Sequence, residues 1–231
     1  MDAKTPTVFA GSGVKTMRRI PVRGLSRLAA YVRGKEILIL GPGSAGKTKF
    51  AQYLQLGALD PEGQREMTYY VTKSPVFIVK VGQEQGLMFE VRRAVDTPGQ
   101  VGPVRHASLV ARRAPHALIV MLDCSTALST TIRWLRLFSN SLDTVLRRGH
   151  YVARRLEAIV VLLNKRDKIS SADAAQLRQA VREVLNQYLS VALGVEWVRS
   201  IPILECISVQ TKEGTALIDE VIGHLAERLA R

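Results

Sequence analysis

The most specific chemical signal in the sequence lies in residues 41–48, which match the pattern G-x-x-x-x-G-K-[ST]. Its glycines let successive backbone N–H groups point at phosphate oxygens, and a helix N-terminus after it adds a positive dipole end. Lys47 can bring charge to the β- and γ-phosphates, and Thr48 can offer its hydroxyl to Mg²⁺. These residues predict a nucleotide phosphate site made of Gly41, Pro42, Gly43, Ser44, Ala45, Gly46, Lys47 and Thr48.

A second chemical segment, Asp96-Thr97-Pro98-Gly99-Gln100, ends an apolar run. A carboxylate at Asp96 can hold Mg²⁺ through water, the N–H of Gly99 can reach the γ-phosphate, and Gln100 can orient an attacking water. The D-x-x-G pattern alone is weak, but it follows the phosphate site by one predicted hairpin. We therefore expect Lys47 and Gln100 to serve as catalytic residues.

Two further segments have the chemistry to select a base. In Asn164-Lys165-Arg166-Asp167, the carboxylate of Asp167 can accept two hydrogen bonds from guanine, whereas adenine would leave it unpaired. Lys165 can lay its methylenes over the base, and Asn164 can tie this segment to the phosphate site. Near the C-terminus, Ser208 can orient Asp167 and the N–H of Val209 can donate to the guanine O6, although a serine at a strand end is a weak signal.

These segments require strands and helices that place them at one edge of a sheet. Apolar runs predict strands over 36–40, 75–81, 87–95, 116–123, 156–163 and 202–207, and helical periodicity predicts helices over 25–33, 47–56, 130–148, 172–193 and 215–229. The 75–81 and 87–95 pair reads as an antiparallel hairpin. Beyond it, strands and helices alternate, which predicts an α/β fold with a mostly parallel sheet and ligands at the carboxyl ends of its strands.

The order of the four segments resembles the Ras-like small GTPase family over about residues 36–231, and most of all its prokaryotic branch, which includes polarity-controlling GTPases. The resemblance implies a P-loop G domain whose six-stranded sheet has one antiparallel edge strand and helices on both faces. It also implies bound GTP or GDP with Mg²⁺, slow hydrolysis, two switch segments, and GTPase-activating and effector proteins as partners.

The resemblance assigns further residues. Gly43 would lie against the γ-phosphate, and a switch threonine would reach Mg²⁺: Thr72, which is better placed before the second predicted strand, with Thr68 as the alternative. Gln210 stands beside Ser208 and Val209, in the second of the two base-selecting segments, where the family usually has lysine. The basic residues Arg105, Arg112 and Arg113 fall in or just beyond the second switch, where no motif marks an internal arginine finger. A P-loop ATPase and a non-hydrolysing nucleotide-dependent scaffold are the alternatives, and neither needs the whole set of segments.

The charge of the chain points to an acidic partner. The 33 Lys and Arg residues outnumber the 20 Asp and Glu residues, and residues 1–36 hold eight basic residues against two acidic ones. We expect residues 1–34 to form a basic extension before a G domain over 35–231. Its apolar stripe could lower into an anionic membrane, or could instead pack on the domain. The stripe comprises Leu25, Leu28, Ala29 and Val32.

Other features of the composition narrow the setting. Nucleic acid is disfavoured as a partner because we find no interleaving of aromatic and basic residues. The two cysteines, Cys124 and Cys206, end apolar runs and read as buried free thiols. Together with the lack of a long apolar run, this predicts a cytoplasmic protein, with a peripheral position at the inner membrane face if the extension binds lipid.

Overall fold

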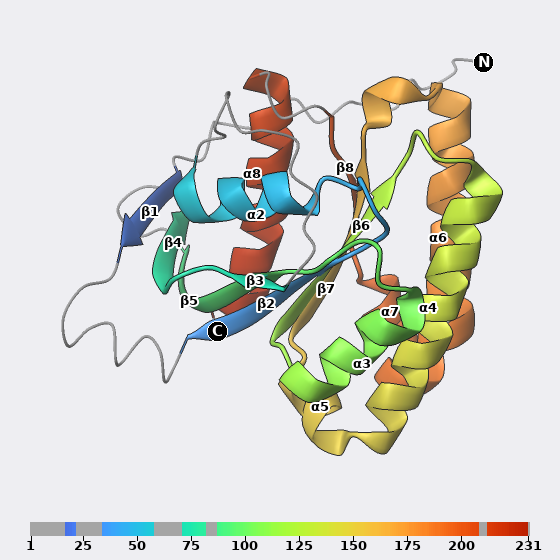
Figure 1. Ribbon diagram of the computed structural model, residues 1–231, viewed down its shortest axis with the longest axis horizontal. Coiled ribbons are helices and arrows are strands. Elements are labelled where there is room, and N and C mark those ends of the chain that lie inside the picture. Colours follow the sequence, from blue (N-terminus) through green and yellow to red (C-terminus); the bar gives the residue numbers. More distant parts are fainter. Residues whose placement is uncertain (1–16, 22–33, 58–70, 82–86, 208–211, 231) are drawn as a thin grey trace, which may run out of the picture.

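A computed structural model describes residues 17–21, 34–57, 71–81, 87–207 and 212–230 (Figure 1). Within this part of the chain, eight strands form one sheet, and helices cover both of its faces. The strands are β1 (Met17–Pro21), β2 (Lys35–Leu40), β3 (Thr72–Lys73), β4 (Phe77–Val81), β5 (Leu87–Asp96), β6 (Ala117–Asp123), β7 (Ala158–Asn164) and β8 (Ile203–Glu205). The helices are α2 (Lys47–Leu56), α3 (Pro103–Arg113), α4 (Leu128–Arg148), α5 (His150–Arg155), α6 (Ser171–Leu193), α7 (Val195–Arg199) and α8 (Lys212–Leu229), with a 3₁₀ turn η1 (Arg166–Lys168).

The sheet has the order β1-β4-β5-β2-β6-β7-β8, with β3 also paired to β5. Strands β5, β2, β6, β7 and β8 are parallel, while β3 and β4 both run antiparallel to β5. Because parallel strands end at the same edge of a sheet, the residues that follow β2, β5, β6, β7 and β8 gather there. This shared edge positions the predicted site.

Alternating side chains on the strands form two apolar cores. In β2, Ile37 and Ile39 face a core shared with α2 and α8, whereas Leu38 and Leu40 face a core shared with α3, α4, α6 and α7. All four side chains are fully buried. Strand β6 alternates in the same way, so both faces are apolar and the sheet is sandwiched between two helical layers.

The predicted α/β class, the mostly parallel sheet and the helices on both faces are confirmed. The prediction of six strands is wrong, because residues 17–21 and 72–73 add two. Strand β1 pairs antiparallel with β4, with Met17 opposite Val81 and Pro21 opposite Phe77. The antiparallel strand β4 therefore lies inside the sheet rather than at its edge, and a boundary at residue 34 falls between two strands of one sheet.

Three helices were not predicted. Helix α3 follows the Asp96–Gln100 segment, and α5 and α7 are short helices that continue from α4 and α6. The helix predicted over 25–33 lies outside the described residues. In the part of the chain that the structure does describe, no helix is long and apolar enough to cross a membrane.

Candidate nucleotide-binding site

The loop between β2 and α2, residues 41–46, has the backbone shape that its glycines predict. We call it the phosphate loop. Gly41 has φ +147°, and a Cβ there would lie 2.1 Å from the carbonyl oxygen of Met121 on β6. Gly46 has φ +91°, and a Cβ there would lie 2.4 Å from the Nδ2 of Asn164. Both glycines are thus required by conformation and by close packing, and together they hold the loop against the carboxyl ends of β6 and β7.

Lys47 begins α2 and folds back over this loop. Its side chain is 5% exposed, and its Nζ donates to the carbonyl of Pro42 at 2.7 Å. Burial lowers the pKa of Lys47 to about 8, and the nearby Asp96 carboxylate opposes that shift. A buried amine with one neutral acceptor is ready to exchange that carbonyl for phosphate oxygens.

The Asp96–Gln100 segment packs directly on the phosphate loop. A Cβ on Gly99 would lie 2.4 Å from the Cα of Gly43 and 2.7 Å from the Nζ of Lys47. Among the described residues, a Cβ on Gly43 would in contrast meet only the Gly99 carbonyl oxygen, at 4.0 Å. Space for a ligand therefore opens in front of Gly43, and Gly99 lies beside it. Gln100 is exposed in the same turn.

Oxygen atoms suited to Mg²⁺ gather beside the loop. The Thr48 hydroxyl donates to Asp96 Oδ2 at 2.7 Å, and Thr72 is the strand partner of Asp96 in the β3–β5 pair. A hydroxyl and a carboxylate are hard oxygen ligands that fit Mg²⁺. Among the described residues, no group of three or more His, Cys, Asp or Glu could hold a metal. Thr68 lies outside the described residues.

The segment Asn164–Asp167 is tied to the phosphate loop as the sequence predicts. Asn164 Nδ2 donates to the carbonyl of Ala45 at 2.9 Å. Arg166 fastens the segment from the other side, with its Nε 3.2 Å from Glu205 Oε2 and its Nη1 donating to the Ile169 carbonyl at 2.8 Å. Asp167 is one-third exposed, and its Oδ2 lies 3.4 Å from Lys168 Nζ. A carboxylate so placed is available to a ligand. Ser208, Val209 and Gln210 lie outside the described residues.

The sequence reasoning missed Asp123, which ends β6 opposite Asn164. Its Oδ2 accepts from Lys165 Nζ at 2.6 Å, while its Oδ1 accepts from the N–H and the hydroxyl of Ser125 at 2.9 and 2.6 Å. Burial alone would raise the pKa of Asp123, but the hydrogen bonds from Lys165 and Ser125 lower it. Its place at a strand's carboxyl end was the available signal. Lys165 adopts φ +61°, so both backbone and side chain are held.

The sequence reasoning also missed His106, a fully buried residue of α3. Its Nε2 lies 3.3 Å from both the Thr97 hydroxyl and the Pro98 carbonyl, and its ring packs edge-on against Trp134 of α4. Burial, followed by the charge of Lys47, lowers the pKa of His106 to about 4. A neutral imidazole thus supports the turn before Gly99. The signal available in the sequence was helical spacing: His106 stands three and four positions before two α3 residues that are buried.

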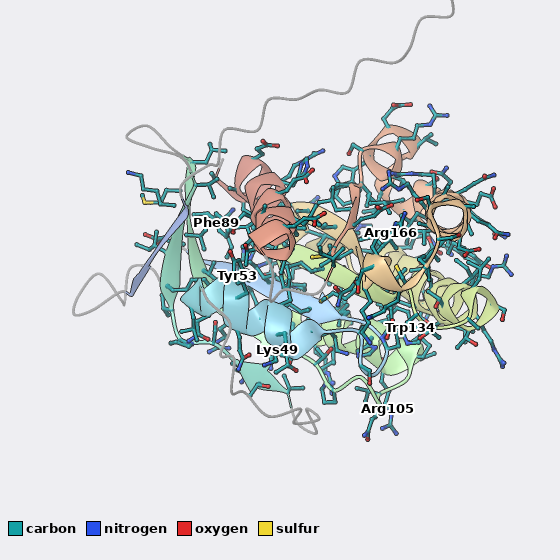
Figure 2. The ribbon with its side chains drawn as sticks, turned by 90° about the horizontal axis from the view of Figure 1, so that it is seen from above. Lys49, Tyr53, Phe89, Arg105, Trp134 and Arg166 are labelled. Carbon is teal, nitrogen blue, oxygen red and sulfur yellow. The ribbon has the colours of Figure 1, made fainter. Side chains whose placement is uncertain are left out.

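The three basic residues after Gln100 do not converge on the phosphate loop. Arg105 lies on the outside of α3 (Figure 2), and Arg112 is also exposed. Arg113 Nη1 lies 3.4 Å from Glu36 Oε1, near the start of β2 and therefore at the other end of the sheet. None of the three is placed as an internal arginine finger.

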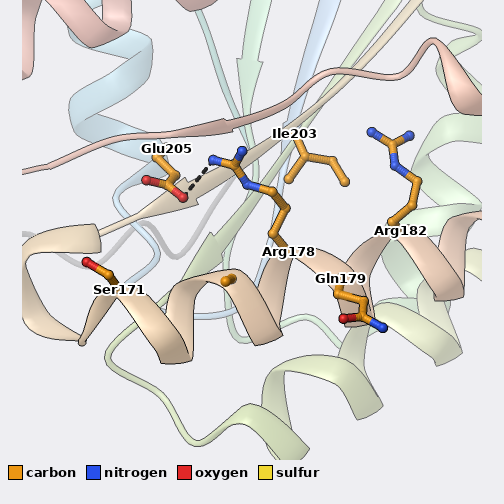
Figure 3. A pocket seen from close by; sticks show the side chains of 7 residues that line it. Ser171, Arg178, Gln179, Arg182, Ile203 and Glu205 are labelled. Atoms are coloured by element: carbon orange, nitrogen blue, oxygen red, sulfur yellow. Dashed lines mark hydrogen bonds and ion pairs between the residues drawn. The ribbon is translucent and has the colours of Figure 1, made fainter. Parts of the chain in front are cut away.

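A separate cleft of about 560 Å³ lies between α6 and β8 (Figure 3). Its polar side chains are already engaged: Arg178 Nη2 pairs with Glu205 at 2.6 Å, and Arg182 donates to the carbonyls of Val198, Arg199 and Ile201. None of the predicted site residues that the structure describes lines this cleft, so we assign the functional site to the sheet edge.

The fold and the geometry of this sheet edge together are those of a P-loop domain. No known family model matches the chain, and no curated protein matches it. Among solved structures, a bacterial selenocysteine-specific elongation factor, EF-Sec, is similar with TM-score 0.52 and 17% identity over 85% of this chain and 29% of that one. Elongation factor SelB from Methanococcus maripaludis, in complex with the GTP analogue GppNHp, is similar with TM-score 0.50 and 13% identity over 85% and 34%.

These likenesses concern the fold, which is that of a P-loop GTPase domain. The chain spans about a third of the length of each elongation factor. The activities and partners of those longer proteins therefore do not transfer to it.

Proposed function

We propose that this protein binds GTP and GDP with Mg²⁺, hydrolyses GTP slowly, and acts as a nucleotide-dependent switch of the small GTPase type. The observation that carries the proposal is the bond from Asn164 to the Ala45 carbonyl. It joins the segment that we propose selects guanine to the loop that we propose binds phosphate, a connection that neither a generic P-loop ATPase nor a chance glycine-rich turn requires. The resemblance of this protein to the prokaryotic branch of small GTPases rests on its sequence segments alone.

Each end of the site has a distinct task. Asp167 would accept hydrogen bonds from the guanine N1 and N2 groups, while the Lys165 stem, held by Asp123, would lie along the base. Backbone N–H groups of residues 43–48 and the Lys47 ammonium would bind the phosphates. Thr48 and Asp96, with Thr72, would hold Mg²⁺, which supplies neutralising charge to the β- and γ-phosphates when bound. The disposition of the α3 arginines accords with slow unassisted hydrolysis.

Base selection is tested by Asp167→Asn. An amide offers a donor where guanine also presents donors, so GTP affinity should fall at least a hundredfold, while xanthosine triphosphate, which has a 2-oxo acceptor, should bind better than GTP. Glu183→Gln removes an exposed carboxylate from α6, the helix that follows this segment, and serves as the control. If the parent bound ATP as tightly as GTP, or Asp167→Asn kept its preference for GTP, the guanine assignment would be wrong.

Hydrolysis and switching need separate measurements. Gln100→Leu should lower single-turnover GTP hydrolysis at least tenfold and leave GTP affinity unchanged, because the side chain orients water rather than the nucleotide. The segments around Thr72 and residues 99–113 should exchange amide hydrogens faster with GDP than with GTP, because loss of the γ-phosphate releases them. Hydrolysis at the parent rate would remove Gln100 from this role, and identical exchange in both states would remove the switch.

The remaining expectations concern partners and location. We propose that GTPase-activating and effector proteins contact the same two segments, and that the protein acts in the cytoplasm. We also retain residues 1–34 as a candidate for anionic membrane contact. Strand β1 uses residues 17–21 of this extension, which leaves the flanking residues for such a role.

A further inference from the structure

A cluster of exposed basic residues covers the end of the molecule opposite the phosphate loop. Helix α4 begins near the carboxyl end of β6 and runs 21 residues, which is about 30 Å, before α5 follows at its far end (Figure 1). Arg147, Arg148, His150, Tyr151 and Arg154 are exposed and Arg155 is partly exposed. We call these six residues the basic end.

The turn between α4 and α5 fixes the direction in which these side chains point. Gly149 ends α4 by donating to the Val145 carbonyl at 2.8 Å, and its own carbonyl accepts from Val152 N at 2.8 Å. A Cβ on Gly149 would lie 3.0 Å from the Val145 oxygen and 3.2 Å from Val152 Cγ2, and Val152 is buried. Helix α5 is therefore seated through Val152 and presents its other side to solvent.

Little acidic charge balances the basic end. Arg147 pairs with Asp143, but in the described part of the chain neither Arg148 nor Arg154 forms an ion pair. The nearby Glu157 is used by Lys35, with Nζ and Oε1 2.7 Å apart. A surface with unpaired arginines attracts anions, and that attraction weakens as salt screens it.

An aromatic side chain stands among these arginines. Tyr151 is 65% exposed, its hydroxyl accepts from Arg155 Nη1 at 2.6 Å, and the Arg155 guanidinium lies 5.7 Å from the ring centroid. The ring is thus held in place although most of it faces water. Tyrosine and arginine are the side chains that suit the level of lipid headgroups, where one part of a side chain meets apolar chains and another meets phosphate.

We propose that the basic end docks on an anionic phospholipid bilayer, with Tyr151 at headgroup level and Arg147, Arg148 and Arg154 against lipid phosphates. A bilayer fits better than a single-stranded nucleic acid, which usually stacks successive bases on several aromatic rings along a groove. Here one ring stands on a projecting helix end. The proposal is independent of residues 1–34 and of the nucleotide, and docking would leave the phosphate loop facing away from the membrane.

The test is co-sedimentation of the full chain with vesicles of phosphatidylcholine, with and without phosphatidylserine. Arg148→Gln/Arg154→Gln should weaken binding to the anionic vesicles about thirtyfold, because each basic side chain near such a surface contributes about a factor of five. Adding Tyr151→Ser to this double variant should weaken binding to the anionic vesicles further. The matched control is Arg133→Gln/Arg136→Gln, which removes the same charge from exposed positions on α4 and should bind as the parent does.

The outcomes separate the possible sources of binding. Preserved circular dichroism in both double variants would show that they remain folded. The proposal is overturned if the parent binds anionic and neutral vesicles equally or not at all, or if both double variants bind equally, which would assign attraction to net charge or to residues 1–34. It is also overturned if a single-stranded RNA binds the basic end and displaces it from vesicles.

Discussion

The low pKa of Lys47 predicts that nucleotide binding takes up a proton. In the free protein burial lowers this pKa to about 8, so about half of the molecules carry a neutral Lys47 at pH 8. A bound β-phosphate would favour the ammonium form and raise its pKa well above 8. Binding of Mg·GDP should therefore take up about 0.5 proton per site at pH 8 and about 0.1 at pH 7.

Isothermal titration calorimetry in buffers of different ionisation enthalpy measures this number directly. The same linkage predicts that GDP affinity falls about fourfold between pH 7 and pH 8.5, since only the protonated lysine binds well. Lys47→Arg is the informative variant because arginine stays charged over this range. Its proton uptake at pH 8 should disappear, and whatever affinity it retains should not depend on pH.

Uptake below about 0.1 proton by the parent at pH 8 would refute the reasoning. It would show that Lys47 keeps its proton in the free protein, and hence that its contact with the Pro42 carbonyl and the nearby Asp96 outweighs burial. The result does not require the variant to bind, because the parent's uptake and pH dependence decide the question alone.

Two further predictions follow from the same site. Without nucleotide, Gly43→Ala should change the free energy of unfolding by less than about 0.5 kcal/mol, yet it should impair GTP hydrolysis. Gly99→Ala should lower the free energy of unfolding by about 1–3 kcal/mol, because its methyl group would clash with Gly43 and Lys47. Urea unfolding measures both changes, and equal losses of stability would contradict the packing. His106 has a folded-state pKa of about 4 against 6.5 when exposed. Its neutral form therefore contributes fully to stability above pH 6.5, and the free energy of unfolding falls by about 3 kcal/mol as the pH falls to 4. His106→Gln should flatten the dependence of stability on pH over that range, and an unchanged slope would remove His106 as its source.

Local patterns allowed much of the fold to be predicted. Helix α2 has the predicted bounds because glycines with positive φ, Gly46 and Gly57, flank it. The buried strands of the parallel sheet were predicted within one or two residues, because continuous apolar runs bounded by polar turns are a strong signal. The phosphate loop followed from spacing alone.

What could not be predicted depends on contacts between distant parts of the chain. Strand β1 contains Arg18 and Arg19, which hide its pattern, and its partner β4 lies some 60 residues later. Asp123 and His106 gained their roles only through neighbours from other elements, Lys165 on the loop after β7 and Trp134 on α4. A sequence shows that such a residue is polar in an apolar setting, but not which group it will meet.

The position of β1 bears on how this chain can be shortened. A truncation that removes residues 1–34 would take away five residues of strand pairing along β4 and leave the N–H and C=O groups of β4 as the margin of the sheet. An uncovered margin of this kind is a template for pairing with a second molecule. A shortened protein would thus be prone to self-association. Any loss of membrane binding or solubility could then come from the newly exposed edge strand β4 as much as from the missing basic charge.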